Sequence, residues 1–84
     1  MSDPQRARSG HYRTADLAQA TYLCCAGHLC EVVPSDQAGR VLFQFSRSEQ
    51  LAADIVSFAT GALKVAPTAY RYMRRELLRR VKAL

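Results

Sequence analysis

The sequence predicts an α+β fold, in which three helices pack on a small antiparallel sheet in a single domain. Apolar residues recur every three or four positions in three segments, which is the spacing of a helix buried on one side. They alternate every second position in two further segments, which is the spacing of strands. The 84 residues leave room for one domain only.

Residues 1–13 are expected to form a flexible basic tail, and residues 14–84 to form the domain. The tail is polar, contains Pro4 and Gly10, and carries three arginines against one aspartate. It lacks the apolar stretch of a signal peptide, and no apolar run approaches the ~20 residues of a membrane span. We therefore expect a cytoplasmic protein with no membrane partner.

The first helix is expected over residues 14–26. Thr14 suits the N-cap, and Asp16 lies in the first turn, where the helix dipole favours a negative charge. Gly27 is expected to end the helix, because glycine readily adopts the left-handed conformation found there. An apolar stripe at helical spacing includes Leu17, Thr21 and Cys24.

A β-hairpin is expected next, with strands over residues 28–33 and 40–46. Apolar and polar residues alternate in both segments, most clearly at Val41, Phe43 and Phe45. Residues 34–39 between them are rich in turn formers, so they predict the connecting loop.

The second helix is expected over residues 47–60. Ser46 and Glu49 have the spacing of a capping box, and Gly61 follows as the stop signal. Its apolar side includes Leu51, Ile55 and Phe58.

The last part of the chain is expected to hold a short strand and a third helix. Residues 62–65 are long enough only for a short third strand. Pro67 suits the first position of a helix over residues 67–84, where its missing N–H costs nothing. The expected order is therefore α-β-β-α-β-α.

The charge of the chain is concentrated at its C-terminal end. Residues 14–63 carry two arginines against five carboxylates, a net charge of −3. Residues 64–84 carry seven basic residues against one glutamate, a net charge of +6, although the whole chain has only +5. Most of these cations are arginines, whose planar guanidinium groups bind phosphate through two parallel hydrogen bonds.

The third helix has an apolar face and an opposite basic face when its residues are placed at 100° intervals. The apolar face comprises Tyr70, Met73, Leu77, Val81 and Leu84. The basic face comprises Arg71, Arg74, Arg75, Arg79 and Lys82, with Leu78 within it, Tyr72 beside it and Arg80 at the apolar edge. Arginines four positions apart repel each other, and a bound polyanion would relieve that repulsion.

These features predict a small non-enzymatic accessory protein that binds the backbone of RNA or DNA, as a subunit of a larger nucleoprotein assembly. The expected contacts are Arg71, Arg74, Arg75, Arg79, Arg80 and Lys82. The alternative is a protein-interaction or homodimerisation module that docks on an acidic partner, with Leu78 and Tyr72 in the contact. A solvated face without a partner and a helix on an anionic membrane surface are further interpretations.

Three cysteines and a histidine lie close together, at Cys24, Cys25, His28 and Cys30. Zinc usually takes its four ligands from two separated pairs, whereas this is one crowded cluster. The odd number of cysteines argues against a disulfide framework. We expect apolar core residues and no metal or cofactor, with zinc and a catalytic thiol paired with His28 as the alternatives.

No pattern typical of an active site is present. The four glycines are isolated, so none forms a phosphate-binding loop, and the carboxylates lie on separate predicted elements. The sequence therefore predicts neither an enzyme nor a small-molecule substrate.

A set of short motifs is distributed along most of the chain. They are Thr14 to Leu17, Tyr22 with Leu23, Gly27 with His28, Val41 to Phe45, Gly61 to Pro67, Tyr70, and Leu77 with Leu78. Together these motifs resemble a family of small bacterial and phage proteins that contain a domain of unknown function. The resemblance covers about residues 12–84 and implies the same α-β-β-α-β-α arrangement, but no activity and no site residues. The basic last helix departs from the family pattern, which ends in a helix of mixed charge.

Overall fold

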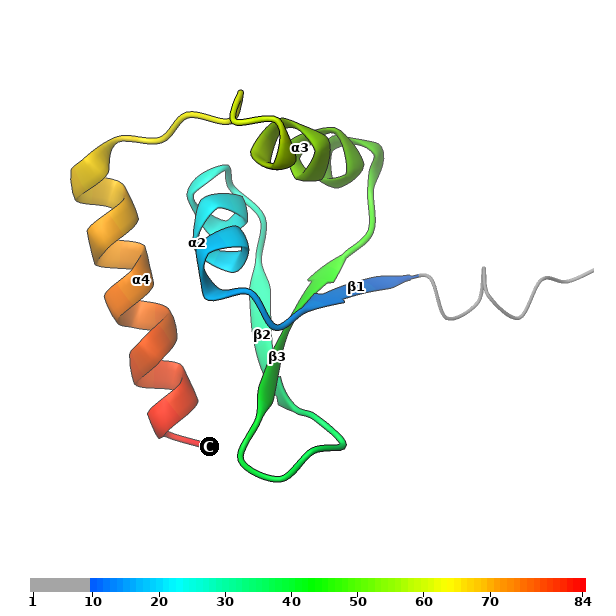
Figure 1. Ribbon diagram of the computed structural model, residues 1–84, viewed down its shortest axis with the longest axis vertical. Helices are drawn as coiled ribbons and strands as arrows, with labels where there is room; N and C mark the ends of the chain where they lie inside the picture. The colour runs from blue at the N-terminus through cyan, green and yellow to red at the C-terminus, as the bar shows by residue number, and fades with distance from the viewer. Residues whose placement is uncertain (1–9) are drawn as a thin grey trace, which may run out of the picture.

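The computed structural model describes residues 10–84 and confirms the α+β class. Within this range, three helices accompany a three-stranded antiparallel sheet (Figure 1). In chain order, the elements are β1 (His11–Thr14), α2 (Leu17–Cys25), β2 (Cys30–Pro34), β3 (Val41–Ser46), α3 (Glu49–Ala59) and α4 (Pro67–Lys82).

The third strand of the sheet lies at the start of the domain. The strand order is β1-β3-β2, so β3 is central, and β1 pairs with it through Tyr12 opposite Phe45. Residues 62–65, where the sequence predicted the third strand, form no strand. Instead, the backbone N–H groups of Ala62 and Leu63 both donate to the carbonyl of Ser57, at 2.7 and 3.0 Å, and so close the end of α3.

The position of β1 also corrects the predicted tail. The last residues of the predicted tail, His11 to Arg13, belong to β1 and therefore to the sheet. Residues 1–9 of the predicted tail lie outside the described residues. The Arg13 guanidinium donates to Gln44 of β3 at 2.7 Å, and the Gln44 amide donates to Glu31 of β2 at 2.9 Å. One row of side chains thus links all three strands.

The helix caps lie two residues later than predicted. Asp16, not Thr14, caps α2, because its Oδ1 accepts from the backbone N–H groups of Ala18 and Gln19. Ser48, not Ser46, caps α3, and its hydroxyl oxygen accepts from Leu51 N at 3.0 Å. Ser46 cannot begin the helix since it still belongs to β3.

The predicted ends of α2 and α3 agree with the structure, whereas α4 ends at Lys82, two residues before its predicted end. Gly27 and Gly61 follow the C-caps of α2 and α3 with φ angles of 104° and 79°, a region that side chains with a Cβ rarely adopt.

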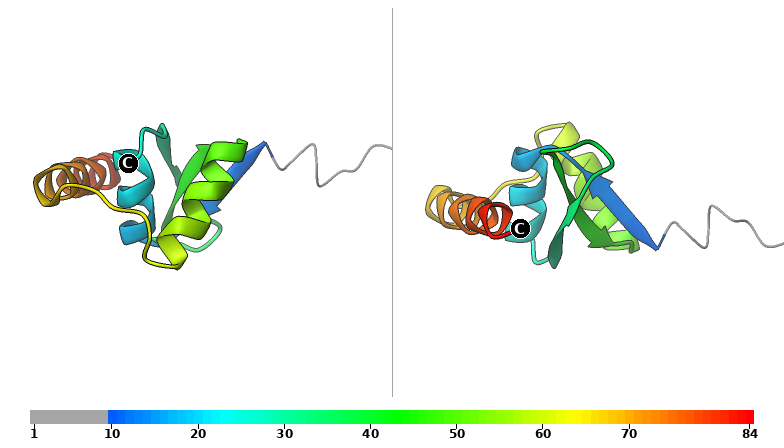
Figure 2. Two further views of the ribbon diagram at one scale, coloured as in Figure 1. Left: turned by 90° about the horizontal axis from the view of Figure 1, so that it is seen from above. Right: turned by 90° about the horizontal axis from the view of Figure 1, so that it is seen from below.

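The core lies on both sides of α2. Figures 1 and 2 show α2 between the sheet and α4, with α3 across one end of the domain. The fully or almost fully buried apolar residues come from four elements: Ala20, Leu23, Phe43, Phe45, Leu51 and Leu77. Tyr22 joins the helices, because its ring packs on Phe58 of α3 at 5.2 Å and on Tyr70 of α4 at 4.9 Å between ring centroids. This packing determines which face of α4 points to solvent.

Candidate nucleic-acid interface

The solvent-facing side of α4 is defined by what its opposite side buries. Leu77 is completely buried in the core, and Tyr70, Met73 and Val81 on the same side are half-buried. The helix begins at Pro67 as predicted, and it has no side-chain N-cap. Its position therefore depends on packing against α2 and the edge strand β2 rather than on capping.

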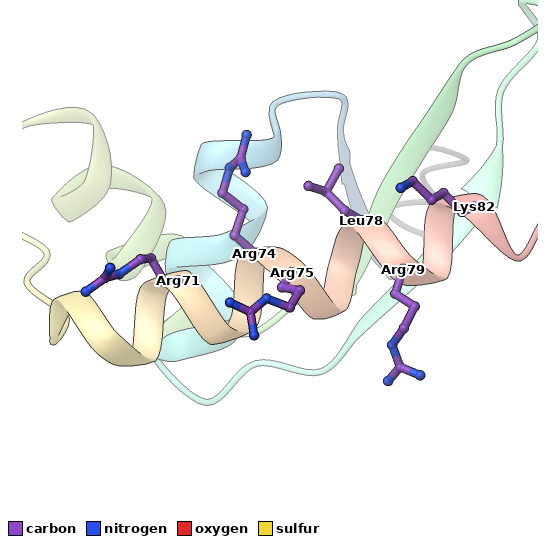
Figure 3. A pocket seen from close by; sticks show the side chains of 6 residues that line it. All are labelled: Arg71, Arg74, Arg75, Leu78, Arg79 and Lys82. Carbon is purple, nitrogen blue, oxygen red and sulfur yellow. The ribbon is translucent and has the colours of Figure 1, made fainter.

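Five exposed cations form one stripe along the free side of α4. This basic stripe consists of Arg71, Arg74, Arg75, Arg79 and Lys82. Together with Leu78, these residues line a shallow hollow of about 490 Å³ (Figure 3). Figure 3 shows Arg74 and Arg79 extending toward opposite sides of the helix. From Arg71 to Lys82 the stripe is about 16 Å long at the rise of an α-helix.

The hollow does not have the form of a small-molecule site. All its lining residues belong to a single helix, so it lies between neighbouring side chains on a convex surface. Pockets for small ligands are usually concave, mostly apolar and built from several elements. The basic stripe is better suited to an extended anionic partner.

Few carboxylates lie near enough to pair with the cations of the stripe. The only acidic residue of α4 is Glu76, whose two oxygens accept from one guanidinium nitrogen of Arg79 at 2.6 and 2.7 Å. This hydrogen bond and the carboxylate charge raise the pKa of Arg79. Within residues 10–84, none of the other four cations forms an ion pair.

The structure separates Arg80 from the other predicted contacts. Its Nη1 donates to the carbonyl oxygen of Cys30 on β2 at 3.0 Å, so this side chain attaches α4 to the sheet. Tyr72 is 60% exposed, but it does not line the hollow. Leu78 lies within the stripe, as the helical projection predicted.

His28 is paired with a carboxylate, not with a thiol. Its Nε2 lies 2.7 Å from Oδ2 of Asp54 on α3, and Gln50 donates to the other oxygen at 3.0 Å. Among the described residues, no three His, Cys, Asp or Glu side chains lie together as metal ligands. No local sequence pattern indicated this pairing, because the two residues are 26 positions apart.

Asp54→Asn is expected to lower the free energy of unfolding by about 1–3 kcal/mol at neutral pH. The hydrogen bond from His28, together with that from Gln50, lowers the pKa of Asp54 below its ordinary value of 3.8. The carboxylate therefore stabilises the fold above that ordinary value and ceases to do so as the pH falls through the folded-state pKa.

Urea unfolding at neutral pH and in acid checks this prediction. The difference between the wild type and the variant should shrink in acid. The control is Asp36→Asn in the exposed hairpin loop, which should change stability by less than about 0.5 kcal/mol. An equal loss of stability in Asp54→Asn at both pH values would contradict the stabilising role of the Asp54 carboxylate.

Comparisons of the chain with protein-family models, with curated proteins and with solved structures found no match. The resemblance to the small bacterial and phage family therefore stays a prediction. In the described part of the chain, none of the helices has the length and apolar character needed to cross a membrane.

Proposed function

We propose that this protein is a non-enzymatic accessory protein that binds the phosphate backbone of RNA or DNA through the basic stripe of α4. The observation that carries the proposal is the alignment of five exposed cations on the free side of a helix whose other side is buried. Backbone phosphates are regularly spaced anions, and such a row of cations is complementary to them.

The spacing of the arginines favours a polyanion over bulk solvent. Arg71, Arg75 and Arg79 follow one another at intervals of four, and each such like-charged pair costs a helix about 0.2–0.5 kcal/mol. Bound phosphates would remove this repulsion. Arginine also binds phosphate with two parallel hydrogen bonds and stacks on bases, whereas lysine acts as a hydrated point charge.

The proposed contacts concern the backbone and not the base edges. Phosphate contacts fix position and affinity but carry no sequence information. The stripe consists almost entirely of cations, with a single apolar side chain, Leu78, among them. We therefore expect weak discrimination between sequences, and we expect any specificity to come from other members of an assembly.

Fluorescence anisotropy across a salt series tests the proposal. The purified chain is titrated into labelled single-stranded RNA, single-stranded DNA and duplex DNA. With four to five phosphate contacts, the logarithm of affinity should fall against the logarithm of salt with a slope of about −4 on duplex and about −3 on single strands. The nucleic acid that the chain binds with the highest affinity is then its preferred class. No binding to any of them at low salt would overturn the proposal.

Leu78→Glu separates this function from the alternative of a homodimer or an acidic protein partner. One added negative charge within the stripe should weaken phosphate binding by about tenfold or less, because four free cations remain. At a protein interface, the same change would bury an unpaired charge and cost several kcal/mol. Sedimentation of both proteins over a range of concentrations gives the second readout. A wild-type dimer that the variant abolishes would favour the protein-interaction function.

A further inference from the structure

Two thiols and a guanidinium line a second cavity, which lies between α2, β2 and α4. Its volume is about 330 Å³, and its lining includes Cys24, Cys30, Met73 and Arg80. Cys24 lies in the last turn of α2 and Cys30 is the first residue of β2, and both are half-buried against the core. Cys25 does not line this cavity, although it is adjacent to Cys24 in the sequence.

The two thiols line the same cavity. The thiol of Cys30 also donates to the carbonyl oxygen of Glu31, with 3.6 Å between the sulfur and the oxygen. Neither thiol is in a disulfide in this structure. Arg80 lies close enough to affect both thiols electrostatically, and its hydrogen bond to the Cys30 carbonyl holds it there. The sequence indicated the two cysteines but not the position of Arg80 beside them, because Arg80 lies 50 positions from Cys30.

The surroundings give the two sulfurs different roles. The neighbouring thiol of Cys24, supported by the charge of Arg80, lowers the pKa of Cys30, although burial and the nearby Glu31 oppose this. The neighbouring thiol of Cys30 and burial raise the pKa of Cys24. Cys30 is therefore the sulfur that ionises first, and the thiolate is the reactive form of cysteine. Burial alone raises the pKa of Cys25.

We propose that Cys24 and Cys30 form a site of reversible oxidation, which hydrogen peroxide converts into a disulfide. The Cys30 thiolate attacks one peroxide oxygen, the O–O bond breaks, and the departing hydroxide takes up a proton to become water. The sulfur of Cys24 then displaces the hydroxyl group from the Cys30 sulfenic acid, and a second water leaves with the Cys24 proton. Two electrons pass from the sulfurs to peroxide, and a dithiol reductant restores both thiols.

Mass spectrometry of the whole chain tests this site. The reduced protein is treated with peroxide at a one-to-one ratio, alkylated, and digested with trypsin. All three cysteines should appear in one peptide, since no lysine or arginine lies between Arg13 and Arg40. Wild type should lose two hydrogen atoms in this peptide and keep a single alkylated cysteine, Cys25. Failure of the folded wild-type chain to form this bond would overturn the proposal.

Single substitutions test which sulfur attacks peroxide and which sulfur then forms the disulfide. Cys25→Ser is the matched control, and it should form the disulfide at the wild-type rate. Cys24→Ser should stop at a sulfenic acid on Cys30, which a dimedone probe captures, whereas Cys30→Ser should lose most of its reaction with peroxide. A bond that includes Cys25, or dimedone labelling mainly at Cys24, would contradict the assignment.

Arg80 provides a test that leaves both thiols in place. Arg80→Gln should slow disulfide formation about tenfold, which corresponds to a rise of one unit in the pKa of the attacking thiol. Arg80→Lys keeps the charge and should recover most of the rate. Circular dichroism of both variants confirms that they remain folded. Equal rates in the wild type and both variants would remove Arg80 from the site.

Discussion

The double variant Arg71→Glu/Arg75→Glu is expected to weaken nucleic-acid binding by about 100-fold at 0.1 M salt. Each phosphate contact adds about −0.9 to the salt slope on duplex DNA, so two contacts contribute a factor of about 60 between 1 M and 0.1 M salt. Repulsion between the introduced carboxylates and phosphate increases the loss. The slope itself should become shallower by about 2.

The same variant should keep its fold. Both side chains are exposed and have no ion-pair partner within the described residues. A glutamate at position 75 would face Arg79 four positions later, and this is a favourable orientation for a helical ion pair. Thermal unfolding should therefore occur at or slightly above the wild-type temperature, and a loss of binding cannot be attributed to unfolding.

A second double variant distinguishes the contribution of the basic stripe to affinity from the contribution of net charge. Arg40→Glu/Lys64→Glu lowers the net charge from +5 to +1, as does the stripe variant, but it alters exposed residues outside α4. Its affinity should fall by less than about fivefold, because salt at 0.1 M screens exposed charges beyond about 10 Å. Equal losses in the two variants would mean that binding follows net charge and that the basic stripe is not the interface.

Leu77→Ala is expected to lower the free energy of unfolding by about 2–5 kcal/mol. Leu77 is completely buried and is the one residue of α4 in the buried apolar core. Removing its side chain leaves a cavity where α4 packs on the rest of the domain. For a domain of this size, the midpoint of thermal unfolding should fall by at least about 10 °C.

The neighbouring residue supplies the control. Leu78→Ala alters a half-buried side chain within the basic stripe and should change stability by less than about 1 kcal/mol. Urea unfolding followed by far-UV circular dichroism measures both variants. Equal stability of Leu77→Ala and Leu78→Ala would contradict the packing of α4 through Leu77. Binding by the Leu77 variant should weaken in proportion to its unfolded fraction, because the stripe depends on a docked helix.

Features of this fold that depend on local spacing could be predicted from the sequence alone. The periods of 3.6 and 2 identified three helices and a hairpin, because amphipathic spacing reflects the geometry of a single element. The basic stripe was predictable for the same reason, since the angle between two residues of a helix depends only on their separation. Gly27 and Gly61 marked helix ends, because the left-handed conformation there is a property of single residues.

Contacts between segments that are distant in the sequence could not be predicted in this way, because they depend on tertiary packing. The four residues of β1 show no clear strand pattern, and they form a strand because β3 offers Phe45 and its neighbours as partners. Residues 62–65 were predicted as a strand but form none, because Ala62 and Leu63 are hydrogen-bonded to the end of α3. The pairing of His28 with Asp54 and the position of Arg80 beside Cys30 likewise join separate elements. Such contacts depend on how whole helices and strands pack, and no local spacing encodes that packing.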